Sequence, residues 1–341
     1  MSETANKPRI LTVLSAPRSG SSALCRLLAA LGLNFGEGKM LLEANRFNKY
    51  GYFERPEILA INDELIRKSR PSEAESLLLN VEIGEQELAS LLINAFWSTC
   101  HQPLSAETPE LLDIVKNAIK DCQWISDTKR NLAWKDARFC MTWNVWQSSL
   151  DMLPIIIWRD PSESAKSIEK TMGIPFKISQ WLWLYYTRAA FLVTEGHDRL
   201  IVRQAKMIAA PDNTAEEICQ FLLSNGYDIS SDYSSAGKVI DKTAITSAHN
   251  PENIASEVKE FQEWLHAGAS GSPPIAPEPD YPEDWVPLIT VINRYKKRSS
   301  LLRERLRAAD HKLDRIRNIP GYTFIGRIIC MYSKLFGKVK I

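Results

Sequence analysis

Short apolar runs alternate with helical patterns through the first two thirds of the chain. Each run is followed by a segment in which apolar residues recur with the period of an α-helix. The four pairs are 10–14 before 22–32, 132–134 before 139–150, 153–158 before 162–171, and 200–202 before 214–224. Continuous β-rich runs that alternate with helices are typical of a parallel sheet covered on both faces. We therefore predict an α/β fold, with a parallel sheet flanked by helices.

A long segment, 55–121, separates the first two predicted strands and is mostly helical in pattern. Pro71, Pro103 and Pro109 interrupt it. We predict a helical insertion over the ligand-bearing edge of the sheet, where contacts with an acceptor substrate are usual.

The end of the chain differs in composition from the main domain, which we predict over 8–266. Five prolines among Ala, Gly and Ser between 268 and 284 predict a linker over 267–284, before a basic helical tail over 285–341. In that tail a heptad seam predicts a coiled coil or a helix docked on the core. The seam consists of Leu288, Ile292, Tyr295, Ser299, Leu302, Leu306, Ala309, Leu313 and Ile316.

The last twenty residues form a second, amphipathic pattern whose only charges are Arg327, Lys334, Lys338 and Lys340. A helix lying on an anionic membrane surface and a helix packed on its own domain both fit this pattern. The tail also holds the basic charge: residues 294–341 have 14 Lys and Arg against 3 Asp and Glu, a net +11, which leaves −10 for the remainder of a chain whose total is +1.

Six cysteines without paired spacing predict free thiols in a reducing, cytoplasmic setting. The five histidines are scattered, and no apolar run reaches the roughly 20 residues that a membrane span needs. We therefore expect neither a metal site nor a transmembrane helix.

The segment 15–22 is the first candidate site, because it joins a predicted strand to a predicted helix. It reads Ser15-Ala16-Pro17-Arg18-Ser19-Gly20-Ser21-Ser22. A tight turn between a strand and a helix N-terminus is a cradle for phosphate, which makes the sheet P-loop-like. Ser15 stands where a Walker A motif has its first Gly, and Ser21 stands where that motif has its Lys. The loop is therefore suited to an anionic nucleotide other than ATP with magnesium.

A second candidate site follows the strand 153–158. Arg159 comes at the end of this strand, Pro161 suits the first turn of the next helix, and Ser167 lies eight residues after Arg159. An Arg fork with a hydroxyl is suited to a second, separate phosphate.

Together these segments resemble the sulfotransferases that use 3′-phosphoadenosine 5′-phosphosulfate, in particular the bacterial and carbohydrate-modifying members. The resemblance extends from residue 8 to about 245, and it includes Asn48-Lys49-Tyr50-Gly51-Tyr52-Phe53-Glu54 and Trp134-Lys135-Asp136-Ala137-Arg138. It implies that Arg159 and Ser167 hold the 3′-phosphate, with Lys238 or Lys242 as a further basic contact. It also implies that the 5′-phosphosulfate is held by Pro17, Arg18, Ser19, Gly20, Ser21 and Ser22.

The resemblance also suggests catalytic residues. Glu54 is the first choice for the base that takes the acceptor's proton, with Asp136 and Glu37 as competitors; a surface Glu at the start of a helix is the other interpretation of Glu54. Lys135 is expected to polarise the sulfuryl oxygens or to form a structural ion pair. Arg18 would oppose the charge on the leaving group. Ala137 stands where the family has Pro, which leaves the direction of Arg138 open.

The predicted function is sulfuryl transfer from 3′-phosphoadenosine 5′-phosphosulfate to a hydroxyl of a glycan or glycolipid. The expected partners are that acceptor, an inner-membrane surface and a second copy of the chain, without nucleic acid. A P-loop nucleotide kinase is the alternative, which the absent Walker Lys disfavours. A non-catalytic interaction protein working through its heptad helix is a third. The Trp-rich stretch 181–186 is predicted to be core rather than a sugar-stacking surface.

Overall fold

The structure is a computed structural model that describes residues 7–44, 48, 50–69, 103–122, 131–229, 236–241 and 254–276. The chain divides into two compact units, Met1–Pro287 and Leu288–Ile341, and every described residue belongs to the first. The predicted heptad helix, the amphipathic helix and Lys242 lie outside the described residues.

Four parallel strands form the centre of the first unit. They are β1 (Arg9–Leu14), β2 (Ala133–Lys135), β3 (Asp151–Trp158) and β4 (Leu200–Arg203), and their order is β2-β1-β3-β4. The register places Leu11 between Ala133 and Leu153. Each strand falls on a predicted apolar run, so the predicted parallel α/β sheet is confirmed.

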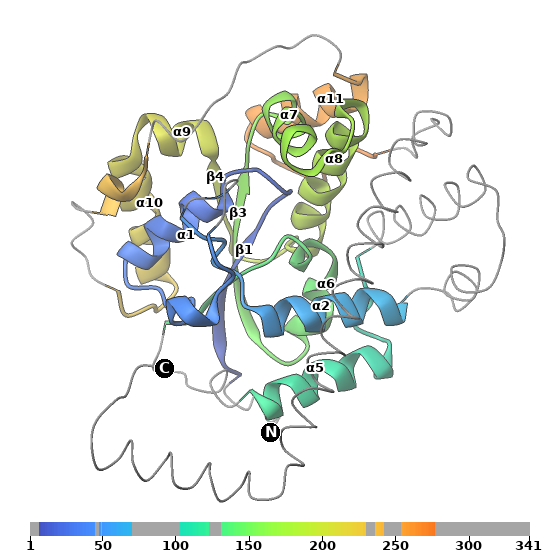
Figure 1. The fold of residues 1–341 in the computed structure, drawn as a ribbon, viewed down its shortest axis with the longest axis vertical. Coiled ribbons are helices and arrows are strands. Elements are labelled where there is room, and N and C mark those ends of the chain that lie inside the picture. The colour runs from blue at the N-terminus through green and yellow to red at the C-terminus, as the bar shows by residue number, and fades with distance from the viewer. Residues whose placement is uncertain are drawn as a thin grey trace, which may run out of the picture. The chain divides into compact units, whose positions relative to one another are not determined.

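One face of the sheet is covered by α1 (Ser21–Ala30) and α10 (Pro211–Ser224), with the short helix α9 (Gln204–Ala209) beside them (Figure 1). Leu11 and Val13 share a buried cluster with Leu24, Leu28 and Ile218. Because side chains alternate along a strand, the neighbouring residues of β1 point to the opposite face. Both faces are therefore apolar, as the continuous hydrophobic runs require.

The opposite face is covered by α6 (Phe139–Gln147), α7 (Pro161–Met172), α8 (Phe176–Val193) and α11 (Ser256–His266) (Figure 1). The Trp-rich stretch lies on α8, where the exposed fraction is 0% for Trp183 and 1% for Tyr185. These rings pack in the core, as predicted. The sequence patterns did not predict α9 and α11.

The described part of the predicted insertion is helical. It consists of α2 (Pro56–Ser69) and α5 (Pro109–Asp121), which contact one another and α6. Proline stands at the first position of both helices, where its missing N–H has no intrahelical acceptor to lose. Within the described residues no helix is long and apolar enough to cross a bilayer.

Two short 3₁₀ helices and a loop complete the described chain. The helix η1 (Gly38–Met40) precedes the motif at 48–54, and η3 (Ala236–Val239) lies against α1 and α10. The described start of the predicted linker contacts α8, because Arg188 Nε donates a hydrogen bond to the carbonyl of Pro274 at 2.8 Å. Ala276 is also buried.

Candidate functional site

The order of the strands identifies the ligand-bearing edge of the sheet. From β1 the chain moves to β2 on one side, and from β3 it moves to β4 on the other. The carboxyl ends of β1 and β3 therefore flank a topological switch point, where open α/β sheets bind ligands. The loop 15–20 follows β1, and Arg159 follows β3, so both predicted phosphate motifs lie at this point.

The loop after β1 has a backbone that leaves a helix N-terminus accessible to an anion. Arg18 and Gly20 have positive φ angles, of 64° and 88°. Gly20 caps α1 without a side-chain hydrogen bond, and no acidic residue stands in the first turn of that helix. The N–H groups of this turn and the positive end of the helix dipole are thus not neutralised by the helix's own side chains.

Gly20 is required for a further reason. A Cβ atom at this position would lie 2.7 Å from Cγ of Gln204, which is itself buried at the start of α9. The loop is therefore packed against α9 with no room for a side chain. Sequence reasoning did not identify Gln204, because its role depends on a contact between distant segments.

The serines of this loop have different surroundings. Among the described residues, the hydroxyl of Ser19 is fully buried and has no hydrogen-bond partner. The hydroxyl of Ser22 accepts a hydrogen bond from Nδ2 of Asn48 at 3.0 Å, which attaches the 48–54 motif to α1. A buried hydroxyl without a partner is uncommon in a folded protein, and such groups are found at catalytic sites and beside bound ions.

Two arginines meet at the switch point. Nε of Arg18 donates to Oγ of Ser167 at 3.1 Å, and a terminal nitrogen of Arg159 approaches the carbonyl oxygen of Arg18 at 3.4 Å. Burial lowers the pKa of Arg18; nearby Tyr52 raises it, and the positive charge of Arg159 lowers it further. The structure thus brings together Arg18, Arg159 and Ser167, and an anion between them would relieve the repulsion of the two cations.

Residues of α7, α8 and α11 contact Arg159 or its neighbour Asp160. The Nε of Arg159 forms an ion pair with Glu163 in the first turn of α7 at 2.9 Å, and the carbonyl of Arg159 accepts from the indole N–H of Trp183 on α8 at 2.8 Å. Asp160 caps α7 and accepts from Gln262 of α11 at 2.8 Å.

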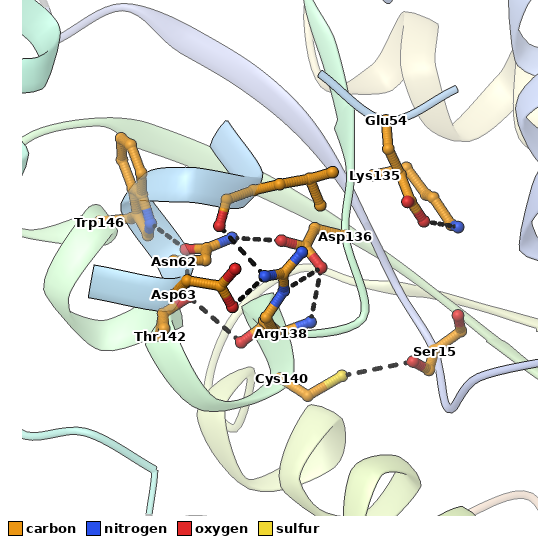
Figure 2. A network of polar contacts seen from close by, with 11 residues as sticks. Ser15, Glu54, Asn62, Asp63, Lys135, Asp136, Arg138, Cys140, Thr142 and Trp146 are labelled. Atoms are coloured by element: carbon orange, nitrogen blue, oxygen red, sulfur yellow. Dashed lines mark hydrogen bonds and ion pairs between the residues drawn. The ribbon is translucent and has the colours of Figure 1, made fainter. Parts of the chain in front are cut away.

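Glu54 and Lys135 form an ion pair at the carboxyl end of β2 (Figure 2). The side chain of Glu54 is 15% exposed and that of Lys135 is 9% exposed. Lys135 is the last residue of β2, and Glu54 lies two residues before the start of α2. The two catalytic candidates therefore lie together, on the side of β1 opposite to β3.

The remaining candidates for the base have other surroundings. Glu37 is exposed at the start of η1. Asp136 is 3% exposed and has both carboxylate oxygens occupied: Oδ1 accepts from the backbone N–H and Nε of Arg138 at 3.0 Å each, and Oδ2 accepts from Nδ2 of Asn62 at 2.7 Å. These contacts favour Glu54 over Asp136 as a proton acceptor.

Two further predictions concern basic residues. Lys238 lies exposed on η3. Arg138, whose direction was open because Ala137 replaces the family's Pro, points away from the switch point to Asp136, Asp63 and the carbonyl of Leu59. Within the described ranges, no group of three or more His, Cys, Asp or Glu side chains is arranged to hold a metal ion.

Comparison with known proteins gives the following findings. No family model matches the chain, and no curated protein matches it. Solved structures similar to it include the sulfotransferase domain of the Synechococcus PCC 7002 olefin synthase (16% identity, 78% of this chain and 97% of that chain, TM-score 0.43). They also include the sulfotransferase domain from the curacin biosynthetic pathway (14% identity, 76% of this chain and 98% of that chain, TM-score 0.43). A third is the sulfotransferase STF9 from Mycobacterium avium (14% identity, 77% of this chain and 77% of that chain, TM-score 0.43).

All three are sulfotransferase structures. They belong to the class of enzyme that the sequence motifs resemble.

Proposed function

We propose that this protein is a sulfotransferase that moves a sulfuryl group from 3′-phosphoadenosine 5′-phosphosulfate to an acceptor hydroxyl. One observation carries the proposal: Arg18, Arg159 and Ser167 meet at the switch point, beside a helix N-terminus that lacks a Walker Lys. Two basic groups and a hydroxyl suit a nucleotide with phosphates at both ends of its ribose better than they suit a triphosphate with magnesium.

The residues present fit such a donor. The loop 17–22 would hold the 5′-phosphosulfate, with the buried hydroxyl of Ser19 and the uncapped first turn of α1 as hydrogen-bonding groups. Arg159 and Ser167 would hold the 3′-phosphate. The donor, when bound, supplies an activated sulfuryl group whose leaving group is a phosphate.

Arg18 and the N–H groups of the first turn of α1 would stabilise the leaving phosphate, because negative charge grows on its bridging oxygen as the bond to sulfur breaks. The dipole of α1 acts in the same direction. These groups are fixed before the reaction by the backbone of the loop, so little reorganisation accompanies charge development.

Glu54 would accept the proton of the acceptor hydroxyl as its oxygen attacks sulfur in line with the leaving oxygen. One S–O bond forms and one breaks, the proton moves to the Glu54 carboxylate, and the electron pair leaves with the phosphate. Lys135, beside Glu54, would attract the sulfuryl oxygens. The pair thereby orients the base before the acceptor arrives.

For the acceptor we propose a hydroxyl of a glycan or glycolipid, at the cytoplasmic face of a membrane. The Arg-containing loop supports a saccharide, since the carbohydrate-modifying members that the sequence resembles have Arg at this position. The basic, amphipathic pattern of the last twenty residues supports a lipid carrier. A second copy of the chain remains a proposed partner through the heptad seam.

Calorimetry with adenosine 3′,5′-bisphosphate tests the donor site. The expected result is binding in the presence of EDTA, and weaker binding of adenosine 5′-monophosphate, which lacks the 3′-phosphate. Tight binding of ATP that requires magnesium, with no binding of the bisphosphate, would overturn the proposal in favour of a kinase. Incubating a cell extract with radiolabelled donor would then identify the acceptor.

A further inference from the structure

A buried polar network connects α2 to the turn between β2 and α6, immediately beside the Glu54–Lys135 pair (Figure 2). Its centre is Asn62, which is fully buried on α2. Nδ2 of Asn62 donates to Asp136, and its Oδ1 accepts from Oγ1 of Thr142 and from the indole N–H of Trp146, each at 2.8 Å. The network does not belong to the phosphate sites and has no role in the mechanism above.

The indole of Trp146 fixes the orientation of the Asn62 amide. An indole N–H only donates, so it must face the carbonyl oxygen of the amide, and the amide nitrogen must then face Asp136. Asp136 is consequently held as an acceptor at Oδ2 while Arg138 occupies Oδ1. With all these groups buried and paired, a different arrangement would leave polar atoms without partners.

The network has direct covalent connections to both members of the ion pair. Asp136 follows Lys135 in the chain, and α2 begins two residues after Glu54. Arg138 adds a second connection to α2, because it donates to the carbonyl of Leu59 at 3.1 Å and pairs with Asp63. Fixing α2 against the β2–α6 turn therefore fixes the backbones that carry Glu54 and Lys135.

We propose that Asn62 is a positioning residue that acts through Asp136 to keep Glu54 and Lys135 in contact for proton transfer. This inference rests on the proposed function. Misplacement of reacting groups by about 1 Å can lower a rate about 100-fold without weakening the binding of a substrate held elsewhere. Asn62 does not touch the switch point, so nucleotide binding is expected to be independent of it.

The test compares Asn62→Leu, which keeps the branched shape and the number of heavy atoms and removes every hydrogen bond of the amide, with Gln180→Leu. Gln180 is a matched control, because it is a buried amide on α8 whose Oε1 accepts from the N–H of Ala255 at 2.7 Å, far in sequence from the ion pair. Three quantities are measured: the rate of sulfate transfer to the acceptor fraction of a cell extract, the dissociation constant of adenosine 3′,5′-bisphosphate, and the reaction of Lys135 with acetic anhydride. Mass spectrometry compares that labelling with labelling of the exposed Lys170.

Asn62→Leu is expected to lower the transfer rate about 10- to 100-fold and to change the dissociation constant less than about threefold. It is also expected to raise the labelling of Lys135 relative to Lys170, while Gln180→Leu changes none of the three. Equal effects of the two variants, or unchanged labelling in Asn62→Leu, would overturn the proposal.

Two outcomes keep the test decisive. If Asn62→Leu does not fold, Thr142→Val removes one donor to the same amide at nearly constant volume, and unchanged Lys135 labelling in that variant overturns the proposal. If the wild-type protein does not bind adenosine 3′,5′-bisphosphate, the proposed function fails. The labelling comparison still decides whether Asn62 maintains the ion pair.

Discussion

The turns after β1 and β2 each contain a partly buried arginine, and the two arginines have different electrostatic surroundings. Burial lowers the pKa of both guanidinium groups, but at Arg138 the carboxylates of Asp136 and Asp63 raise it above its ordinary value. At Arg18, whose Nε donates to the hydroxyl of Ser167, Tyr52 raises the pKa and the positive charge of Arg159 lowers it, and the pKa stays below its ordinary value. The carboxylate partners of Arg138 join its turn to α2, whereas Arg18 lies beside a second guanidinium, that of Arg159, which is itself paired with Glu163.

The largest predicted effect comes from removing the arginine of the anion site. Arg18→Ala should lower kcat/KM for sulfate transfer about 100- to 1,000-fold, because the leaving phosphate loses a preorganised donor. Arg188→Ala is the control, since Arg188 is also partly buried and donates to the carbonyl of Pro274 in the 268–276 loop. Transfer of radiolabelled sulfate measures both. If Arg18→Ala kept more than half of the wild-type rate, the contrast between the two arginines would have no functional meaning.

Asp136→Asn should damage the scaffold instead. The new amide would direct a donor either at Arg138 or at Nδ2 of Asn62, so the free energy of unfolding should fall by about 3 kcal/mol. Asp63→Asn is the matched control, because Asp63 is the solvent-exposed carboxylate that also pairs with Arg138. With its side chain 70% exposed, it should cost under about 1 kcal/mol. Urea denaturation measures both, and equal losses would mean that the buried carboxylate is not the stronger partner.

A smaller effect is expected at the second arginine of the anion site. Arg159→Ala should reduce the preference for adenosine 3′,5′-bisphosphate over adenosine 5′-monophosphate about 10- to 100-fold, because only the first ligand has a 3′-phosphate. Arg203→Ala is the control, since Arg203 lies at the end of the neighbouring strand β4 with its guanidinium over the Trp158 ring. Calorimetry with the two nucleotides gives the ratio. An unchanged ratio in Arg159→Ala would assign the 3′-phosphate to other residues.

The smallest predicted effect concerns Gly20 in the loop 15–20. A comparison with Gly32 separates the cost of backbone strain from the cost of close packing. Gly20→Ala and Gly32→Ala both place a side chain at positive φ, 88° and 98°, on either side of α1. A Cβ at Gly32 would meet nothing within 4 Å, whereas one at Gly20 would overlap Gln204. Each change should cost about 1 kcal/mol from strain, and thermal unfolding should show a further loss only for Gly20→Ala. Equal losses would show that α9 can move away.

The apolar pattern was sufficient to predict the four strands and their helices, because each strand is buried on both faces and reads as a continuous run. The positions of the 15–20 turn after β1 and of Arg159 after β3 were also predictable, since both depend on local sequence. The contacts of Asn62 and Gln204 and the hydrogen bond of the Trp183 indole were not, because each joins segments that are distant in the sequence. Glu54 was already preferred over Asp136 from the resemblance, and the tertiary partners of Asp136 add an independent reason that local sequence does not contain.

The position of the Trp183 indole has a consequence for mutagenesis aimed at the proposed acceptor selectivity. A row of aromatic residues invites mutagenesis aimed at sugar selectivity. Here the ring is buried and its N–H supports the carbonyl of Arg159. Under the proposed function, libraries built on α8 would disturb the support of Arg159 and with it nucleotide affinity, and variation is better directed at the residues around Glu54.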